Sequence, residues 1–400
     1  MKYPSIRDAV TALSALQGQV LSMPLPKRLR LPEVTDFKRA VLQEAYDLLH
    51  AKGSQELSSS QALEQLYQDP QFMEKAGAGR FDHVTLVSMY MSARHQAVKG
   101  PIFTINPALN LLLEDTGIKN DVPAQFFAPP YPTCFLEFDP AERREQSSHE
   151  LYAGGFISIC EGAFIQETKM DNLLKLRPET REALELDPLA PARVLELGFS
   201  ASPAKNQQAL STGLPAAFDN MDLMSIYIQD ENEPIKDILE RHVRFYTQRY
   251  QDQATPTSRG KTFTQLFEDN FAYLTKVLFY LNVEKHSMRK ETEASDLEKR
   301  IEQVADKKKD KLKRQLQRVY DRIVVGPDHY TPIKDLLPHS ELPKGTKAPH
   351  YRRGYFGIRW KGHGQAKTAE LIRVSHALVN MHLLKDPSVA PKAPKDYEIR

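Results

Sequence analysis

The chain has 400 residues, of which 41% are hydrophobic and 26% charged, and its formal net charge is only +2. This length predicts two or three compact units, and this composition excludes a disordered or collagen-like chain. Two cysteines, Cys134 and Cys160, are too few for a disulfide framework or a cysteine-rich zinc site.

No signal peptide is expected, because Asp8, Gln17 and Gln19 interrupt any apolar run near the N-terminus. The most apolar helix that we expect, over residues 271–283, is too short to span a bilayer and contains Lys276. We therefore expect a soluble, cytoplasmic protein without a membrane partner.

Residues 1–121 are expected to form a helical layer. Apolar residues recur with helical spacing from Phe37 to Leu49, where Thr35-Asp36 provides a start signal and Gly53 a stop signal. Similar patterns predict three further helices, over residues 60–67, 81–98 and 106–116.

Residues 122–288 are expected to form a central α+β domain. A proline-rich stretch leads into aromatic, alternating residues that are typical of a strand. The strands predicted here cover residues 134–138, 152–160, 193–199 and 223–229. The helical crossovers that parallel neighbours require are not evident, so we predict a mostly antiparallel sheet. Helices are expected over residues 234–250 and 262–283, and the charged stretch 169–190 is compatible with a helix.

Residues 289–325 are expected to form a long charged helix or a helical hairpin. Between residues 289 and 322 there are twelve Lys or Arg and eight Asp or Glu, with a thin apolar seam. The seam breaks at residues 307–309, which favours a hinge near Asp306–Asp310 over a long coiled coil. Contact with nucleic acid is one interpretation of this run, but the interleaved acids favour a solvated helix.

Residues 326–400 are expected to hold a connector and then a basic, aromatic β-hairpin. Its strands are predicted at residues 355–361 and 368–379, joined by a turn at 362–365. Eight Lys or Arg lie between residues 344 and 373 against a single acid, Glu370. The fold expected overall is thus α+β, with an N-terminal helical layer, a central mostly antiparallel sheet, long helices and a C-terminal β-hairpin.

The hairpin is the part of the sequence that best suits binding. Arginine beside aromatic rings fits a polyanion or a peptide carboxylate, since guanidinium groups pair with oxygens and ring faces accept stacking. The plainer alternative is a solvated basic hairpin. The residues that we expect to bind a partner are Arg352, Arg353, Gly354, Tyr355, Phe356, Trp360, Lys361 and Lys367.

Recognisable catalytic motifs are absent from the sequence. It contains no phosphate-binding glycine loop, HExxH motif, EF-hand loop or nucleophile elbow, and its histidines show no metal-ligand spacing. We therefore expect no metal and no cofactor. His350 and His363 could act as acid and base on a phosphodiester, as in a metal-free ribonuclease, with Arg352, Arg353 and Lys367 stabilising the charge. Two histidines in a basic loop have no fixed geometry, so an enzyme is the less favoured interpretation.

The hairpin resembles the C-terminal signature of a phage- and plasmid-borne family that includes a type V-A anti-CRISPR protein. The centre of the chain is also similar to that family, in the segments 130–138 and 155–156. One departure is that Tyr355-Phe356 stands where the family often has His-Trp. The matching C-terminal residues are Pro349, His350, Arg352, Arg353, Gly354, Trp360, Gly362, Gly364, Gln365, Ala366, Lys367, Arg373, Val379 and Asn380.

The resemblance implies a mode of action within a bacterial host cell. The anti-CRISPR member of the family recognises the nascent N-terminal peptide of its target nuclease and provokes loss of the encoding mRNA. The partners implied are such a peptide, of a CRISPR nuclease or of another target protein, together with the ribosome or the mRNA. The family implies no catalytic residue.

Three hypotheses therefore stay open from the sequence. The chain could be a peptide-recognising inhibitor of a defence nuclease, an RNA-binding protein or ribonuclease that uses the same hairpin, or a structural or assembly factor of a phage or plasmid.

Overall fold

The computed structural model describes most of the chain from residue 94 onward and little before it. The described residues are 25–36, 94–138, 158–201, 221–250, 263–316, 319–332, 350–363 and 367–379, together with positions 8, 68, 70, 91, 92, 145 and 146. No helix within these residues is long and apolar enough to cross a membrane.

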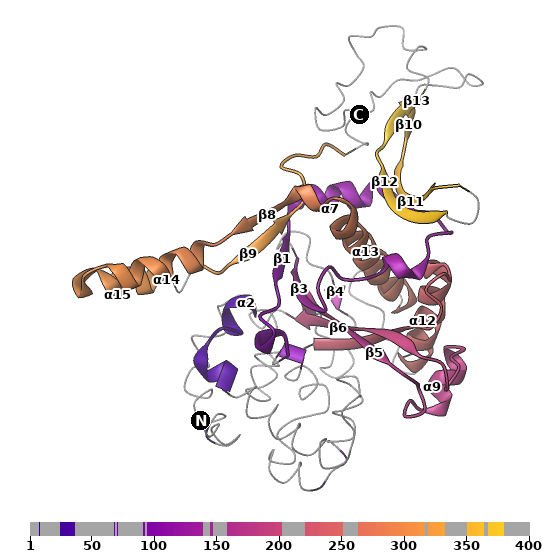
Figure 1. Ribbon diagram of the computed structural model, residues 1–400, viewed down its shortest axis with the longest axis horizontal. Coiled ribbons are helices and arrows are strands. Elements are labelled where there is room, and N and C mark those ends of the chain that lie inside the picture. The colour runs from indigo at the N-terminus through magenta and orange to yellow at the C-terminus, as the bar shows by residue number, and fades with distance from the viewer. Residues whose placement is uncertain are drawn as a thin grey trace.

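The centre of the molecule is a large mixed sheet (Figure 1). Its strands lie in the order β7-β6-β5-β3-β1-β9-β8, and β4 pairs separately with β5. Only the pairs of β1 with β3 and of β1 with β9 are parallel, so the sheet is mostly antiparallel and the predicted α+β class is confirmed. The strands are β1 Ile102–Ile105, β3 Thr133–Glu137, β4 Glu145–Gln146, β5 Ser158–Met170, β6 Ala192–Ala201, β7 Met221–Ile228, β8 Met288–Glu291 and β9 Arg322–Val325.

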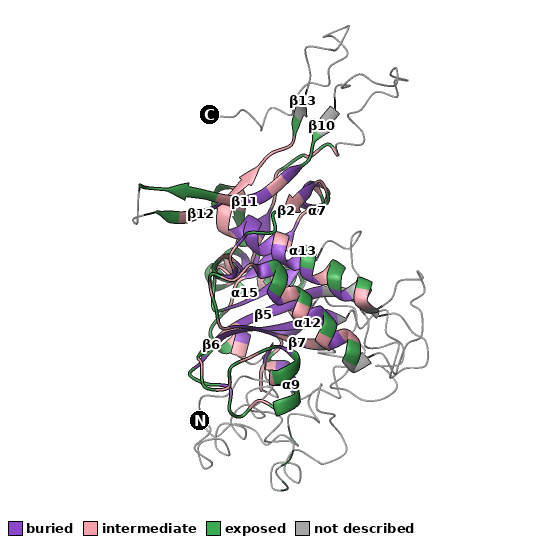
Figure 2. Ribbon diagram, turned by 90° about the vertical axis from the view of Figure 1, so that its right-hand side faces the viewer, coloured by how far each residue is buried: buried purple, intermediate pink, exposed green. Residues whose placement is uncertain are grey.

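Helices α12 (Ile235–Tyr250) and α13 (Phe263–Val283) lie against one face of this sheet (Figure 2). Phe271, Leu274 and Leu278 of α13 share one apolar core with inward-facing residues of β3, β5, β6 and β7. A helix that is apolar around much of its circumference is stable only when buried, which explains why α13 lies against the sheet. The short helices near this core are α7 Pro107–Glu114, η1 Ala124–Phe126, α9 Pro178–Ala183 and η4 Lys285–Ser287.

The opposite face of the sheet is covered by the chain just before β1. The ring of His95 packs edge-on against Phe164, with the ring centroids 5.2 Å apart, and Gln166 donates a hydrogen bond to the carbonyl of Met91. Strand β3 is buried along its whole length. The other helices expected before residue 90 lie outside the described residues.

Two helices form an arm that projects from the edge of the sheet between β8 and β9 (Figure 1). These are α14 (Glu293–Gln303) and α15 (Asp306–Leu316). The helical hairpin is thus the correct alternative for the charged segment, but its hinge lies at Val304–Ala305, before the position expected. Lys27 of helix α2 (Leu25–Arg28) donates hydrogen bonds to the carbonyls of Leu316 and Val319 at the base of the arm.

A second, smaller sheet holds the C-terminal hairpin. Strands β11 (Gly354–Lys361) and β12 (Thr368–Val374) pair antiparallel, as predicted, and β2 (Thr116–Ile118) pairs parallel with β11. Strands β10 (His350–Arg352) and β13 (Ala377–Val379) extend the same ladder outward as a separate pair.

Several expected elements are wrong. Strands β1 and β2 lie within residues 1–121, where only helices were expected, and β9 lies at the end of residues 289–325, where only a helix or helical hairpin was expected. These strands are very short, and their pairing partners are remote in sequence, so local periodicity does not reveal them. The stretch 169–190 has only one short helix, α9.

The strand predicted at residues 152–160 continues much further, to Met170 in β5. Residues 152–157 lie outside the described part, and the pairing of β5 with β6 shifts register between Cys160 and Gly162. A Cβ atom on Gly162 would lie 2.4 Å from the carbonyl oxygen of Leu136, so only glycine fits this close approach. Gly162 thus marks an irregularity within the strand, which continues beyond it.

Candidate functional site

The C-terminal hairpin is anchored to the body by an aromatic contact. Phe356 of β11 is fully buried, and its ring packs edge-on against Phe279 of α13, with the centroids 5.7 Å apart. On the same face of the hairpin, Arg373 makes an ion pair of 2.8 Å with Glu284, just past the end of α13. The expectation that Phe356 forms a binding surface is therefore wrong: it belongs to the core.

Gly354 is required for the pairing at the start of the hairpin. It lies between β2 and β12, where a Cβ atom would meet the carbonyl oxygen of Val374 at 2.8 Å. Because that neighbour is backbone, it cannot rotate away as a flexible side chain could. Gly354 thus shapes the hairpin and offers no side chain to a partner.

The two adjacent arginines have different surroundings. Arg353 donates a hydrogen bond to the carbonyl of Glu114, at the end of α7, where cations stabilise the free carbonyl groups of a helix. Arg352 lies with its guanidinium carbon 5.7 Å from the centroid of the Tyr355 ring, and the ammonium of Lys119 lies 4.6 Å from the same centroid. Arg352, Tyr355 and Lys119 therefore form a small cationic cluster at the surface, while Arg353 is occupied by the fold.

The outer end of the hairpin extends beyond the core and is largely exposed (Figure 2). Trp360 is 63% exposed, although it lies on the same face of β11 as the buried Phe356. On the other face, Arg359 and Lys361 both bind the carboxylate of Glu370, at 2.6 Å and 2.7 Å. The hydrogen bond from Lys361, followed by that from Arg359, lowers the pKa of Glu370. The charge of Lys361 is thus partly neutralised within the hairpin.

The remaining predicted residues lie at the edge of the hairpin. Lys367 and His363 are exposed, on either side of the turn. The backbone of His350 is in β10, but its side chain lies outside the described residues. The hairpin therefore brings together two exposed groups: Arg352 with Tyr355 near the body, and Trp360, Lys361 and Lys367 at the tip.

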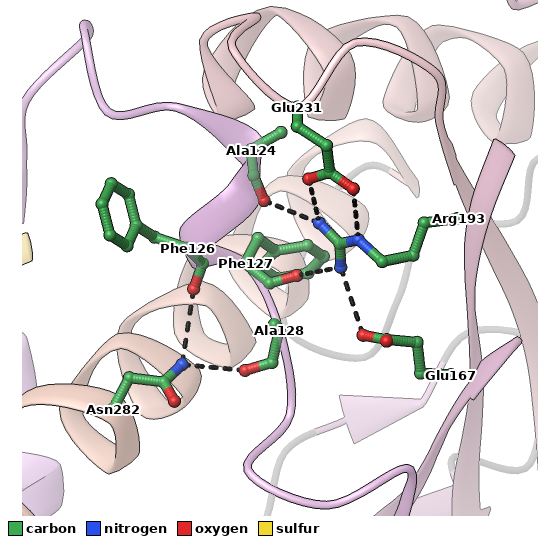
Figure 3. A network of polar contacts seen from close by, with 8 residues as sticks. All are labelled: Ala124, Phe126, Phe127, Ala128, Glu167, Arg193, Glu231 and Asn282. Atoms are coloured by element: carbon green, nitrogen blue, oxygen red, sulfur yellow. Dashed lines mark hydrogen bonds and ion pairs between the residues drawn. The ribbon is translucent and has the colours of Figure 1, made fainter. Parts of the chain in front are cut away.

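An extensive polar network lies elsewhere in the molecule and was not predicted (Figure 3). Arg193 of β6 binds Glu231 through two hydrogen bonds of 2.7 Å and 2.8 Å and also contacts Glu167 at 3.3 Å. It further donates to the carbonyls of Ala124 and Phe127. Burial by itself lowers the pKa of Arg193, but the hydrogen bonds and charges of the two glutamates raise it above its ordinary value.

This network fixes the loop around η1 to the end of the sheet. Asn282 of α13 holds the other side of the same loop by donating to the carbonyls of Phe126 and Ala128. All donors of Arg193 face acceptors of the chain itself, so the network is structural. No sequence signal identifies it, because its members are far apart along the chain.

Metal and thiol chemistry find no site among the residues that the structure describes. No group of three or more His, Cys, Asp or Glu side chains there could hold a metal ion. Cys134 is buried in β3, and burial raises the pKa of its thiol to about 12, which keeps it protonated and unreactive.

Comparison with known proteins gives similarities of two kinds, to a family model and to solved structures. A family model described as the anti-CRISPR type V subtype A2 family, AcrVA2-like, matches residues 103–381. The crystal structure of AcrVA2 is similar over 86% of this chain and 94% of that chain, with 11% sequence identity and a TM-score of 0.40. No curated protein matches the chain in sequence.

Proposed function

Because the chain belongs to the anti-CRISPR type V subtype A2 family, we propose that it recognises the nascent N-terminal peptide of a CRISPR effector nuclease, or of another target protein. It then lowers expression of that target through loss of the mRNA, in the cytoplasm of a bacterial host. The chain acts as a binding protein here rather than as an enzyme.

The observation that carries this proposal is the exposed tryptophan beside a free strand edge. In the described part of the chain, no further strand pairs with the outer edge of β12, and Trp360 stands 63% exposed on the neighbouring strand. A large exposed aromatic ring is unusual at a surface without a partner, since tryptophan is favoured at the centres of binding interfaces.

An extended peptide suits this arrangement. It can add to the edge of β12 through backbone hydrogen bonds, which require no particular sequence, while side-chain contacts provide the selectivity. Trp360 offers an apolar wall, and the exposed cations Arg352 and Lys367 offer partners for acidic peptide groups. A chain emerging from the ribosome is extended and unfolded, so it meets the geometric requirement of strand addition.

The test is the single substitution Trp360→Ala in cells that express the target nuclease. We expect the substitution to restore the target protein and its mRNA to the levels found without the inhibitor, because the contact surface is lost while the fold stays intact. The matched control is Leu189→Ala, since Leu189 is equally apolar and 71% exposed but lies far from the hairpin in sequence. The control should lower the target as the parent does.

Target levels that stay low with Trp360→Ala would contradict the site. Arg352→Ala is the second variant, and it is preferable to a change at Arg353 because Arg353 binds the end of α7. The ribonuclease hypothesis is tested by incubating the purified protein with the transcript and no ribosomes. Cleavage under these conditions would require an activity of the chain itself.

A further inference from the structure

Helix α15 carries a stripe of positive charge along one side. It has six basic and two acidic residues within Asp306–Leu316. Lys307, Lys311 and Arg314 follow the i, i+4, i+7 spacing that places residues on one face of a helix. All three are exposed, and the neighbouring Lys308 is exposed too.

The two acids of α15 do not interrupt this stripe. Asp310 borders it, three residues after Lys307 and four before Arg314, and Asp306 binds Lys309 at 2.9 Å. In the described part of the chain, the side chains of the stripe make no ion pair and no hydrogen bond. The companion helix α14, which is acidic, makes its ion pair internally, between Lys299 and Asp296.

Such a stripe works against the helix that carries it. Like charges four residues apart, such as Lys307 and Lys311, destabilise a helix by a few tenths of a kcal/mol per pair, and Asp310 beside the stripe offsets part of this cost. A local rule that is only partly compensated is expected at a functional surface. The lysines do not serve to cover apolar surface with their aliphatic stems, since few residues of α15 are even half-buried.

The arm holds the stripe in a defined orientation. Leu312 and Leu316 of α15 are half-buried, and Leu297 of α14 is buried. At the base, Asp321 accepts hydrogen bonds from the backbone amides of Ala294 and Ser295, and Lys27 donates to the carbonyl of Leu316. The arm projects away from the body, so a long partner can approach it (Figure 1).

We propose that the stripe of Lys307, Lys311 and Arg314 binds the phosphate backbone of an RNA. Regular exposed lysines without apolar or aromatic neighbours suit repeating phosphates, whereas protein interfaces are depleted in lysine and rich in aromatic residues. Bases are not read, because the stripe offers no side chain that stacks or pairs with a base edge. The choice of RNA over DNA rests on the proposed function, in which the arm keeps the mRNA beside the hairpin.

The test measures binding of a labelled 20-nucleotide single-stranded RNA to the full chain at several salt concentrations. The parent should lose affinity steeply with salt, and Lys307→Ala with Lys311→Ala should reduce the slope of log K against log [salt] by about 1.4, at about 0.7 per phosphate contact. Affinity in 50 mM salt should fall roughly ten-fold or more for the same reason. Alanine favours helices, so the arm should stay folded, as circular dichroism will show.

The matched control removes two positive charges from the other helix of the same arm, by Lys299→Ala with Arg300→Ala. If stripe and control variants weaken RNA binding equally, net charge alone is responsible and the proposal is overturned. Absence of RNA binding by the parent, binding of DNA but not RNA, or stripe-dependent binding of polyglutamate instead of RNA would each overturn it too. The last outcome would identify an acidic protein as the partner.

The same variants keep this inference separate from the proposed function. If RNA binding fails while Trp360→Ala still restores the target, only the role of the arm is wrong. If Trp360→Ala has no effect while the stripe binds RNA as expected, only the peptide site is wrong.

Discussion

His242 is an uncharged histidine held between helix α12 and strand β7. One ring nitrogen, Nδ1, donates to the carbonyl of Ile238, and Nε2 accepts a hydrogen bond from the amide of Tyr227. Both ring nitrogens are satisfied only in the neutral ring, and burial lowers the pKa of His242 to about 4. Protonation would therefore break the hydrogen bond to the outermost strand of the main sheet.

The stability of the protein should fall as the pH drops from 6.5 towards 4. In this range the unfolded chain takes up a proton at His242, with its ordinary pKa of 6.5, and the folded chain does not. This group alone costs roughly 2 kcal/mol of stability at pH 5. In urea denaturation, the gap in unfolding free energy between the parent and His242→Gln should narrow by that amount from pH 7 to pH 5. A gap that stays constant would show that His242 does not titrate in this way.

The first helix of the arm is capped by a residue that follows the second helix in sequence. Thr292, at the N-cap of α14, makes no side-chain capping bond, and Asp321 instead accepts hydrogen bonds from the amides of Ala294 and Ser295, both of 3.0 Å. Partial burial by itself raises the pKa of Asp321, but the hydrogen bonds from Ser295 and the charge of Arg30 outweigh it, so the pKa is lowered. Asp321, which follows the arm in sequence, thus caps the N-terminus of α14, the first helix of the arm.

Asp321→Ala should loosen the base of the arm by about 1 kcal/mol, which is typical for loss of a helix cap. Hydrogen exchange at the amides of Ala294 and Ser295 should then accelerate. Because the folded-state pKa of Asp321 is lowered, the parent keeps this protection at neutral pH and loses it as the pH falls through that pKa. The control is Asp328→Ala, which removes only an exposed ion pair of 3.1 Å with Arg289 and should change exchange little. Equal effects of both changes would contradict the capping role.

In the molecule as a whole, one face of the hairpin packs against the body near Phe356. The same face continues beyond the body and is exposed at Trp360. Phe356 and Trp360 lie four residues apart on that same face of β11. Phe356 meets Phe279 of α13, whereas Trp360 lies beyond the end of the core. One side chain therefore belongs to folding and the other is free for binding.

Removing these two rings should change the stability of the protein by very different amounts. Phe356→Ala leaves a cavity at the junction of hairpin and body and should cost about 3–5 kcal/mol, while Trp360→Ala should stay within about 0.5 kcal/mol. The free energy of unfolding, measured in urea, compares the two directly. If Trp360→Ala were as damaging as Phe356→Ala, the exposed position of Trp360 in solution would be contradicted.

Long elements with strong periodicity were predictable from the sequence. Helices α12 and α13 and strands β6 and β7 have nearly the expected bounds, since local apolar spacing determines them. The short strands β1, β8 and β9 were missed, because they exist only through pairing with strands remote in sequence. The position of the hairpin strands followed from alternation, but the contact of Phe356 with α13 did not.

Composition and periodicity are local properties, and they were enough to predict the α+β class, the charged arm and the basic hairpin. Which side chains are available to a partner depends instead on how the elements pack together. It buries Phe356, uses Arg353 at the end of α7, binds Lys361 to Glu370 and leaves Trp360 exposed. It also leaves Lys307, Lys311 and Arg314 exposed along one side of α15, since a helix distributes adjacent residues over different faces. Burial and strand pairing depend on contacts between residues that are distant in the sequence, and local patterns do not reveal these contacts.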